Sequence, residues 1–415
     1  MIENIIEFAI FSLYAFCLYV ILYSKTKDFL NPFGIPVFSF IFIFAISRLR
    51  LNPLQSTLSF KTYLIVILVS MLIFFIGIVS INSIKTKQYP KKPENPEVTF
   101  RYKYAFRMVF FLTTICFFLT LFEVRFYDFL FLYSDVDDKK TIIDFESSIR
   151  IIRYFTNLLP YCAIYAFFEI LFDKNKTKLT TLFNIFVISF ALFFSMFILM
   201  SRGTLLIILL GFLYLYNQKK RIDLNKLFII SVLLISILTI MISIRLTPNS
   251  AVFKGELSLP FFNSIYNYLV FSFDNFNQLV IQGSPYTIFK SVHISLTKLL
   301  NIYNIDEIFQ YTTSFFNTTT FIYYFFHDLG IIGVITYTIV IFSLIGFLYV
   351  QINSGKSYLV LVLAVYQKAL FMLFFGNYFF GNFSISNAYY ITIILVLFSY
   401  TFPWKKYIKT KRFRT

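Results

Sequence analysis

Charged residues are scarce in this chain of 415 residues. Only 14% are Asp, Glu, Lys or Arg, whereas 58% are hydrophobic, and the mean hydropathy is +0.75. This composition excludes an ordinary soluble domain, in which about 25% of residues are charged. Glycine and proline are also few, at 12 and 11 residues, which argues against the strands of a membrane barrel. Apolar runs long enough to cross about 30 Å of hydrocarbon recur along the chain, so the sequence predicts an all-α, polytopic integral membrane protein.

Cysteine and histidine are too few to suggest redox or metal chemistry. The three cysteines, Cys17, Cys116 and Cys162, lie inside apolar runs, where a thiol is most often a small buried hydrophobic group. The acidic segment 123–149 lacks the glycine turn and the terminal glutamate of a calcium loop. A solvated acidic loop is the favoured interpretation, and contact with an acceptor sugar stays open as the alternative. We therefore expect neither a metal nor a cofactor.

The apolar runs divide the chain into about 11 transmembrane helices, within a range of 10 to 12, in a single transmembrane domain over residues 1–415. The predicted spans are 5–23, 33–47, 62–84, 105–122, 150–171, 180–200, 204–216, 227–246, 322–350, 357–380 and 388–402. The N-terminal segment MIENIIEF lacks the basic region of a secretory signal, so we expect the first helix to be retained.

Lysine-rich pieces fall on alternate connections between these spans. They are Lys25 and Lys27, the stretch from Lys85, DKNKTK from Asp173, NQKKRIDLNK from Asn217 and the tail KKYIKTKRFRT. By the positive-inside rule these connections are cytoplasmic, which places the N-terminus outside and the C-terminus inside. The net charge of +17 needs no nucleic-acid partner, because 22 of the 37 basic residues lie on this inner side, where anionic membrane lipid and topology account for them.

Arginine has a different distribution from lysine. The predicted inner side carries 18 Lys and 4 Arg, whereas the outer side carries 6 Lys and 7 Arg. The outer arginines are Arg48, Arg50, Arg125, Arg150, Arg153, Arg202 and Arg245. Arginine stays ionised and grips phosphate with two parallel hydrogen bonds. The distribution therefore favours a lipid-linked phosphate on the outer leaflet as ligand.

One connection, residues 247–321 between predicted helices 8 and 9, is much longer than the others. Long loops in compact proteins are commonly lids or binding elements. The stretch that begins at Glu256 has apolar and aromatic residues at helical spacing, which predicts amphipathic helices lying on the outer membrane surface.

The chain turns from one helix into the next at Ser201, Arg202 and Gly203, with almost no loop between them. Ser201 suits an N-cap for a helix starting near Thr204, and free amides at a helix N-terminus favour an anion. A pyrophosphate cradle and an arginine that snorkels to outer headgroups remain equally open, and the same alternatives hold for Arg245. A further pair, Arg150 and Arg153, is expected to share one helix face.

Three fragments resemble the O-antigen polymerases (Wzy), the bacterial oligosaccharide repeat-unit polymerases. They are MSRGTLLIILLGFLYLY from Met200, YNYLVFSFDNFNQLVIQ from Tyr266, and TTTFIYYFFHDLGIIGVITYTIVIFSLIGFLY from Thr318 with its Asp-x-Gly-x-x-Gly pattern. Each is short, but their order around one large outer loop is similar to that of the family. The resemblance implies a GT-C-type polymerase and ligase architecture.

The resemblance also implies an activity at the outer face of the bacterial inner membrane. A growing glycan on undecaprenyl pyrophosphate would be transferred to a sugar hydroxyl of an incoming lipid-linked repeat unit, without a metal or nucleotide sugar and with a chain-length co-polymerase as a further partner. Arginines would stabilise the departing pyrophosphate, and a base would assist the hydroxyl. The candidates are Arg202 and Arg245 for the leaving group, Asp274, His327 and Asp328 for the base, and Tyr268 and Asn275 for substrate binding.

Two details qualify these assignments. The ligase-like pattern would place a histidine nine residues before the acidic position, where this chain has Thr319, so O-antigen ligase activity is disfavoured. For His327, an interfacial histidine bonded to backbone is an equally open interpretation.

Lys368 lies near the middle of the predicted span 357–380, so we expect it to face the substrate or to pair with Glu169 or Asp328, unless the helix is shallower.

Two other classes of protein remain as alternatives. A lipid-linked oligosaccharide flippase would also use arginines, but transporters typically contain repeats and helices broken near the midplane, and the sequence shows no repeat and few breakers. A glycan O-acetyltransferase would need an acyl-donor site at the inner leaflet, and no histidine lies on a predicted cytoplasmic segment.

Overall fold

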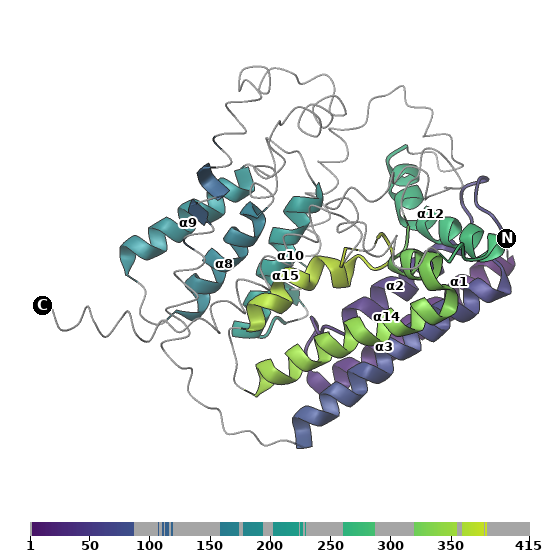
Figure 1. Cartoon of the computed structure of the whole chain (residues 1–415), viewed down its shortest axis with the longest axis horizontal. Coiled ribbons are helices and arrows are strands. Elements are labelled where there is room, and N and C mark those ends of the chain that lie inside the picture. Colours follow the sequence, from purple (N-terminus) through teal and green to yellow (C-terminus); the bar gives the residue numbers. More distant parts are fainter. Residues whose placement is uncertain are drawn as a thin grey trace, which may run out of the picture.

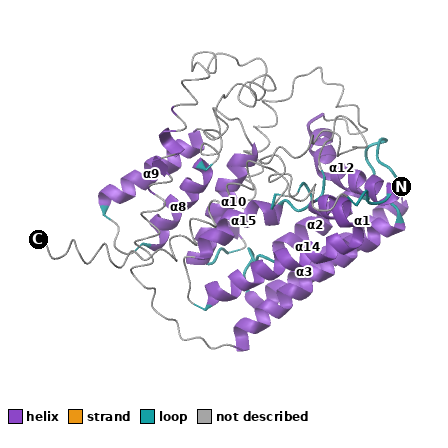
Figure 2. Cartoon of the chain, viewed as in Figure 1, coloured by secondary structure: helices purple, strands orange, loops and turns teal. Residues whose placement is uncertain are grey.

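A computed structural model describes most of the apolar part of the chain (Figure 1). The described residues are 2–86, 158–173, 177–193, 202–223, 260–286, 319–354, 359–376 and 378–379, with scattered positions between 107 and 118 and between 225 and 229. Within them the elements are α1 (Ile2–Thr26), α2 (Gly34–Ser47), α3 (Phe60–Thr86), α8 (Leu159–Phe172), α9 (Lys178–Phe193), α10 (Arg202–Lys219), α12 (Pro260–Gln282), α14 (Phe321–Asn353) and α15 (Val360–Phe371). All are helices, as Figure 2 shows by colour.

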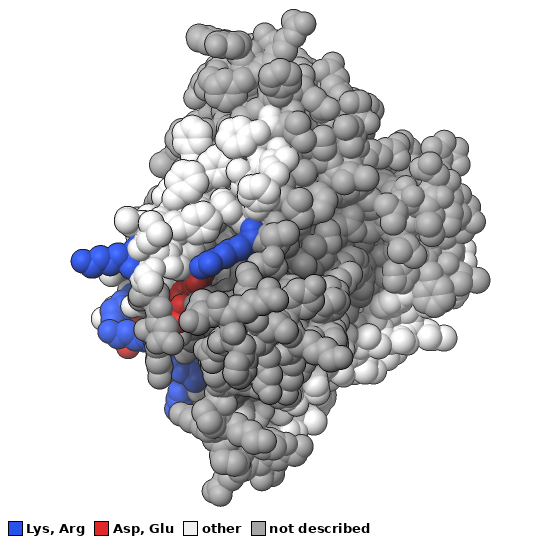
Figure 3. Space-filling model, turned by 60° about the vertical axis from the view of Figure 1, so that its left-hand side comes forward, with Lys and Arg blue, Asp and Glu red and all other residues white. Residues whose placement is uncertain are grey.

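Three of the described helices, α1, α3 and α14, are long and apolar enough to cross a membrane. Large apolar side chains along α1, such as Ile10, Leu13 and Phe16, are exposed on the surface of the protein. A surface of exposed, uncharged apolar side chains is favourable in contact with lipid and unfavourable in contact with water. In Figure 3 the described lysines and arginines of the visible face gather on one flank, and the remaining visible described surface is almost free of charge. The elements of the described residues are therefore all helices, and three of them have the length and apolar composition of membrane spans.

Helices α1, α2, α3 and α14 form one group and run side by side in Figure 1. Two glycines allow these helices to approach closely. A Cβ atom at Gly77 of α3 would lie 2.8 Å from Cβ of Phe33, and one at Gly346 of α14 would overlap the hydroxyl of Ser80. Small residues at helix contacts are typical of packing in membranes, where close van der Waals contact replaces the hydrophobic driving force.

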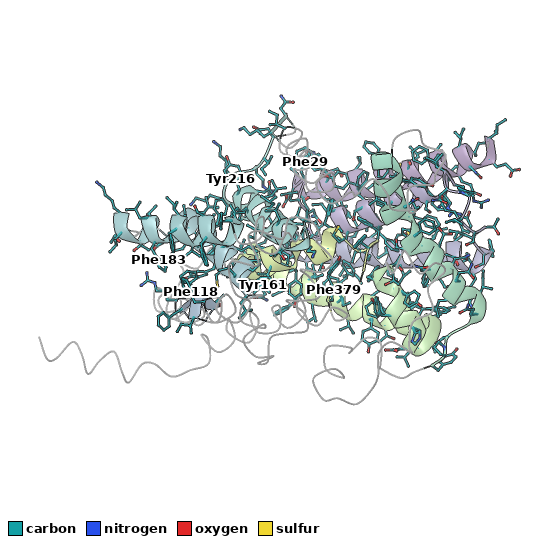
Figure 4. All side chains as sticks on the ribbon, turned by 90° about the horizontal axis from the view of Figure 1, so that it is seen from above. Phe29, Phe118, Tyr161, Phe183, Tyr216 and Phe379 are labelled. Carbon is teal, nitrogen blue, oxygen red and sulfur yellow. The ribbon has the colours of Figure 1, made fainter. Side chains whose placement is uncertain are left out.

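Helices α8, α9, α10 and α15 form a second group, which contacts the first through α15. Here Gly211 of α10 makes room for α8, because an added Cβ would lie 2.6 Å from Cδ1 of Ile164. Aromatic rings fill the rest of the contact, with Phe167 and Phe212 stacked at a centroid distance of 4.3 Å. In the view from above, the labelled Tyr161 and Phe379 lie in the middle of the molecule (Figure 4).

Helix α14 is broken near its start, at Gly330, which has φ 61° and ψ −146°. Only glycine adopts this conformation readily. The chain then folds back so closely that a Cβ at Gly333 would overlap the carbonyl oxygen of Phe325. From Ile331 to Asn353 the helix is still about 35 Å long at 1.5 Å per residue, enough to cross a membrane without the first segment. The sequence predicted a continuous helix over 322–350, so the break is a correction to that prediction.

Helix positions otherwise agree with the predicted spans wherever the structure describes them, with two exceptions. Helix α8 begins at Leu159, after a turn at Leu158, inside the predicted span 150–171. Helix α15 ends at Phe371 and continues as turns through Phe375, whereas the prediction extended the helix to residue 380. The predicted span 388–402 and most of 105–122 and 227–246 lie outside the described residues.

Candidate functional site

Polar side chains gather at two opposite ends of the first helix group. At one end, the turn between α1 and α2 meets the C-terminal end of α10; Phe29 and Tyr216 mark this place in Figure 4. Asp28 is 1% exposed, and its carboxylate accepts hydrogen bonds from Nδ2 of Asn217 at 2.6 Å and the backbone N–H of Leu30 at 3.0 Å. The guanidinium of Arg221 lies 3.3 Å from the same carboxylate. These contacts join two connections that the lysine pattern places on one side of the membrane.

At the other end, helix α12 packs against the connection between α2 and α3, residues 48–59. We call this contact the α12 junction. The polar side chains that α12 contributes to this contact form one stripe along the helix, and they are Tyr266, Asn267, Asp274 and Asn277. The spacing of these residues places them on a single helix face. Because the stripe faces the protein and residues 270–277 are all buried, α12 is enclosed more deeply than the predicted surface-lying helix.

The α12 junction exists because the irregular 48–59 segment has backbone groups that need partners away from water. The stripe of α12 supplies them. Tyr266 Oη accepts a hydrogen bond from the N–H of Leu51 at 3.0 Å, and Asn277 Oδ1 accepts one from the N–H of Ser59 at 2.8 Å. Asn277 also donates to the carbonyl of Thr57 at 3.1 Å. Helix α12 therefore fixes the conformation of this connection.

Arg48, one of the predicted outer arginines, follows α2 and is fully buried. Its Nη1 donates to Oη of Tyr63 at 3.0 Å, and that hydroxyl donates to Glu7 at 2.8 Å. The guanidinium carbon also lies 5.3 Å from the ring centroid of Phe44. The ring contact and the hydrogen bond to the hydroxyl offset part of the desolvation cost of burying this cation. Arg48 therefore contributes fixed positive charge to the α12 junction.

Asp274, a predicted base, is fully buried at the centre of the α12 junction. Its Oδ1 accepts hydrogen bonds from the backbone N–H and the hydroxyl of Ser56, at 3.1 and 3.0 Å, and Oδ2 accepts one from Gln55 at 3.4 Å. Burial raises the pKa of Asp274, and the Ser56 hydrogen bonds and the nearby Arg48 charge oppose that shift. A carboxyl group with a raised pKa is suited to proton transfer, but this one also anchors the 48–59 segment.

The two other predicted bases, His327 and Asp328, lie on the first segment of α14 and are buried. Nδ1 of His327 is 3.7 Å from Oδ1 of Asp328. The segment after α12 reaches them, since the hydroxyl of Ser284 donates to the carbonyl of His327 at 2.9 Å. Ring contact between Phe276 and Phe326, at 5.8 Å, joins the same two helices. The structure thus brings all three predicted bases to the end of the bundle where α12 lies.

Lys368 lies in the last turn of α15 and is 2% exposed. The sequence predicted Lys368 near the middle of a long span, and this prediction is corrected because helix α15 is shorter. At the C-terminus of a helix, the helix dipole favours a basic side chain. Its Nζ lies 4.3 Å from the ring centroid of Tyr378, a cation–π contact. Glu169 forms an ion pair with Arg107 at 3.9 Å, and the carboxylate of Asp328 lies 3.7 Å from the imidazole of His327.

Arg202 opens helix α10, two residues earlier than predicted, with Gly203 in the same turn. Helix α10 ends beside Asp28, whereas α15 ends at the start of α14, where Leu373 accepts a hydrogen bond from the N–H of Phe321 at 2.9 Å. The two helices are therefore antiparallel, and they touch at Gly211, whose added Cβ would lie 3.4 Å from the carbonyl oxygen of Ala364. Arg202, the first residue of α10, is therefore at the end of this helix pair where α15 ends and α14 starts.

The remaining predicted site residues divide into three sets. Asn275 is fully buried beside Asp274. Tyr268 belongs to α12, but its side chain lies outside the described part of the structure, as does that of Arg202. The residues that lie wholly outside it are Ser201, Arg245, Arg150 and Arg153.

Sequence reasoning missed most of the α12 junction. Arg48 and Arg50 were recognised as outer arginines but not as parts of a site, and Gln55, Ser56 and Asn267 were not singled out. One signal was present: two arginines separated by a single residue follow an apolar span. In the described residues no group of three or more metal-ligating side chains occurs.

Comparison with known proteins identifies no relative. No family model matches the chain, and neither a curated protein nor a solved structure matches it significantly. What the described residues define is an all-helical fold with three helices long and apolar enough to cross a membrane and a buried polar junction at one end of the first helix group.

Proposed function

We propose that the protein is a membrane glycosyltransferase that polymerises undecaprenyl-pyrophosphate-linked oligosaccharide repeat units on the outer face of the bacterial inner membrane. The observation that carries this proposal is the gathering, at one end of the bundle, of residues predicted separately as outer: Asp274 of α12, His327 and Asp328 of α14, and the backbone of Arg202. One-sided chemistry on a lipid-linked substrate requires such a gathering. The full architecture would have about 11 spans and resemble the GT-C type.

The proposed reaction is a single displacement at a sugar carbon. The hydroxyl oxygen of the acceptor repeat forms a bond to the anomeric carbon of the donor glycan, while the bond from that carbon to the pyrophosphate oxygen breaks. Undecaprenyl pyrophosphate leaves with the electron pair, and the hydroxyl proton passes to a base. Arg202 and Arg245 would stabilise the charge on the leaving group, because guanidinium groups already in position need no reorganisation during the step.

Among the predicted bases, the environment of Asp274 supports a role in holding the site together as well as in proton transfer. Three donors already occupy its carboxylate, and its pKa is raised by burial. His327 and Asp328 lie at the same end and complete the set of candidates. Lys368 over the Tyr378 ring would add a positive charge near the start of α14.

Deletion of the gene, followed by gel analysis of surface glycans, tests the proposed activity. A polymerase deletion retains the single-repeat product and loses the ladder of longer glycans, whereas a flippase deletion loses both. Reintroduction of Arg202→Lys then tests the arginine, because it retains the charge and loses the forked geometry. We expect a strongly shortened ladder; an unchanged ladder would reject a bidentate role for Arg202.

A further inference from the structure

Two buried N–H donors at the α12 junction have no acceptor. Nδ2 of Asn267 and Nε of Arg50 are both shielded from solvent, and neither has a hydrogen-bond partner in the part of the chain that the structure describes. Asn267 is only 1% exposed. Buried donors without partners are costly and uncommon in folded proteins, and each one calls for a physical reason.

The orientation of the Asn267 amide is determined by its neighbours. The backbone N–H of Leu54 donates to Oδ1 of Asn52 at 2.9 Å, so Asn52 must present its Nδ2 group to α12. That group donates to Oδ1 of Asn267 at 2.9 Å. Nδ2 of Asn267 is therefore the free end, and exchanging its amide atoms would place two donors against each other.

Arg50 lies directly before the two residues that bond to α12. Leu51 donates to Tyr266 and Asn52 donates to Asn267, so the backbone of Arg50 is two residues from the partner of the Asn267 amide. The nearby carboxylates have other partners: Glu7 accepts from Tyr63, and Asp274 accepts from Ser56 and Gln55. The unpaired donors thus include a guanidinium N–H with no acid assigned to it.

We propose that Asn267 and Arg50 hold a phosphoryl oxygen, that of the diphosphate on the lipid-linked substrate. An anionic oxygen is the acceptor that a guanidinium and an adjacent neutral amide satisfy together, and hydrogen bonds to charged groups are the strongest available. The identity of the diphosphate rests on the proposed function. A phospholipid headgroup offers the same chemistry, and the experiment separates the two sources.

The test measures binding of geranylgeranyl diphosphate to the full-length protein in phosphatidylcholine nanodiscs. We expect Asn267→Asp and Arg50→Gly to weaken binding by about ten- to hundredfold, the loss typical of a charge-assisted hydrogen bond. Lys27→Gly is the matched control, because Lys27 has φ 52° where Arg50 has φ 50°, and its Nζ lies over the Tyr23 ring at the opposite end. It should bind like the parent protein. Arg50→Lys, which retains the charge, replaces Asn267→Asp if that variant does not fold.

Equal affinities for the parent protein and all variants would overturn the proposal. Nanodiscs containing phosphatidylglycerol form the second arm. If phosphatidylglycerol does not reduce binding of geranylgeranyl diphosphate, the lipid diphosphate is supported as the ligand. If phosphatidylglycerol abolishes that binding, and does so only when Asn267 is present, the diphosphate assignment is overturned and the donors bind a phospholipid headgroup. The inference and the proposed function fail separately: a gene deletion that leaves the glycan ladder intact rejects the polymerase, and a measured Arg50-dependent affinity remains.

Discussion

The two connections of helix α2, before and after the helix, differ in how their buried polar groups are hydrogen-bonded. Each contains a basic residue in the left-handed backbone region, Lys27 with φ 52° before α2 and Arg50 with φ 50° after it. At the first connection, Asp28 is surrounded by donors, and Asn217 uses both its amide nitrogen and its amide oxygen. At the second, Asn267 and Arg50 each retain a buried donor without an acceptor.

This difference indicates which end is structural and which end is functional. The Asp28 carboxylate is fully engaged by donors, which stabilises the fold and leaves this acid nothing to offer a ligand. Among the described residues near it, the one unpartnered buried group is the neutral hydroxyl of Tyr214, whereas the α12 junction includes an unpartnered guanidinium N–H. Backbone strain is the same at both connections, but unsatisfied buried donors lower stability, and a bound ligand is one reason for a protein to retain them. Under the proposal that Asn267 and Arg50 hold a phosphoryl oxygen, the α12 junction is the end where unsatisfied donors are kept for a ligand. The following predictions would break or sharpen this contrast, from the largest effect to the smallest.

Removal of Asp28 should produce the largest loss of stability. Asp28→Ala leaves Asn217 and the Leu30 N–H buried without their acceptor, at a cost of about 3 kcal/mol. Thermal unfolding in detergent measures the loss. The control is Asp223→Ala, since that acid is 72% exposed and pairs only with Lys226 on the surface in the described structure, so no measurable shift is expected. Equal shifts of the unfolding temperature in the two variants would show that the contacts of Asp28 do not stabilise the fold.

The break in α14 should be nearly as sensitive. Gly330→Ala adds a Cβ 3.3 Å from the hydroxyl of Tyr286 at φ 61°, and we expect a loss of about 2 kcal/mol. Gly376→Ala is the control, because its Cβ would meet Tyr378 at an ordinary 3.7 Å. Unfolding temperatures of the two variants provide the comparison. A stable Gly330→Ala protein would argue that the break is not needed to position His327 and Asp328.

Asp274 should make stability depend on pH. Burial raises its pKa, so the fold favours the protonated carboxyl, and this contribution is present at low pH and is lost as pH rises from the ordinary value through the raised one. Asp274→Asn removes that dependence while retaining an oxygen acceptor for Ser56. Unfolding temperatures at about pH 4 and pH 8 should therefore differ less in the variant than in the parent. A larger difference between the two unfolding temperatures in the variant than in the parent would contradict a raised pKa of Asp274.

Relief of backbone strain should have the smallest effect. Arg50→Gly and Lys27→Gly both replace a left-handed residue with glycine, and each should stabilise the protein by about 0.5 to 1 kcal/mol. Chemical or thermal unfolding would detect the gain. Destabilisation by Arg50→Gly alone would mean that its side chain supports the fold and is not reserved for a ligand.

Periodicity and composition predict the helices well because apolar length is itself the cause of a membrane helix. The predicted spans 5–23, 33–47 and 62–84 correspond to α1, α2 and α3, and the helical nature of 260–282 was also expected. Side-chain contacts were less accessible to prediction. Tyr266 and Gln55 are 211 residues apart in the chain, and no spacing rule encodes their 2.7 Å hydrogen bond.

The candidate site illustrates the same limit. The sequence selected Asp274, His327 and Asp328, and the structure places all three at the α12 end of the bundle. It did not predict that α12 turns its polar stripe toward residues 48–59, because that direction depends on which backbone groups of the connection need partners. The break at Gly330 was missed for a similar reason, since one glycine in an apolar run does not reveal its backbone angles.

The central claim is that the two ends of α2 differ in function, and one complementation experiment tests it most directly. A deletion strain would receive either Arg50→Gln or Lys27→Gln, and its surface glycans would be separated by gel electrophoresis. We predict single-repeat product without a ladder for Arg50→Gln and a full ladder for Lys27→Gln. Full ladders from both variants would contradict the account.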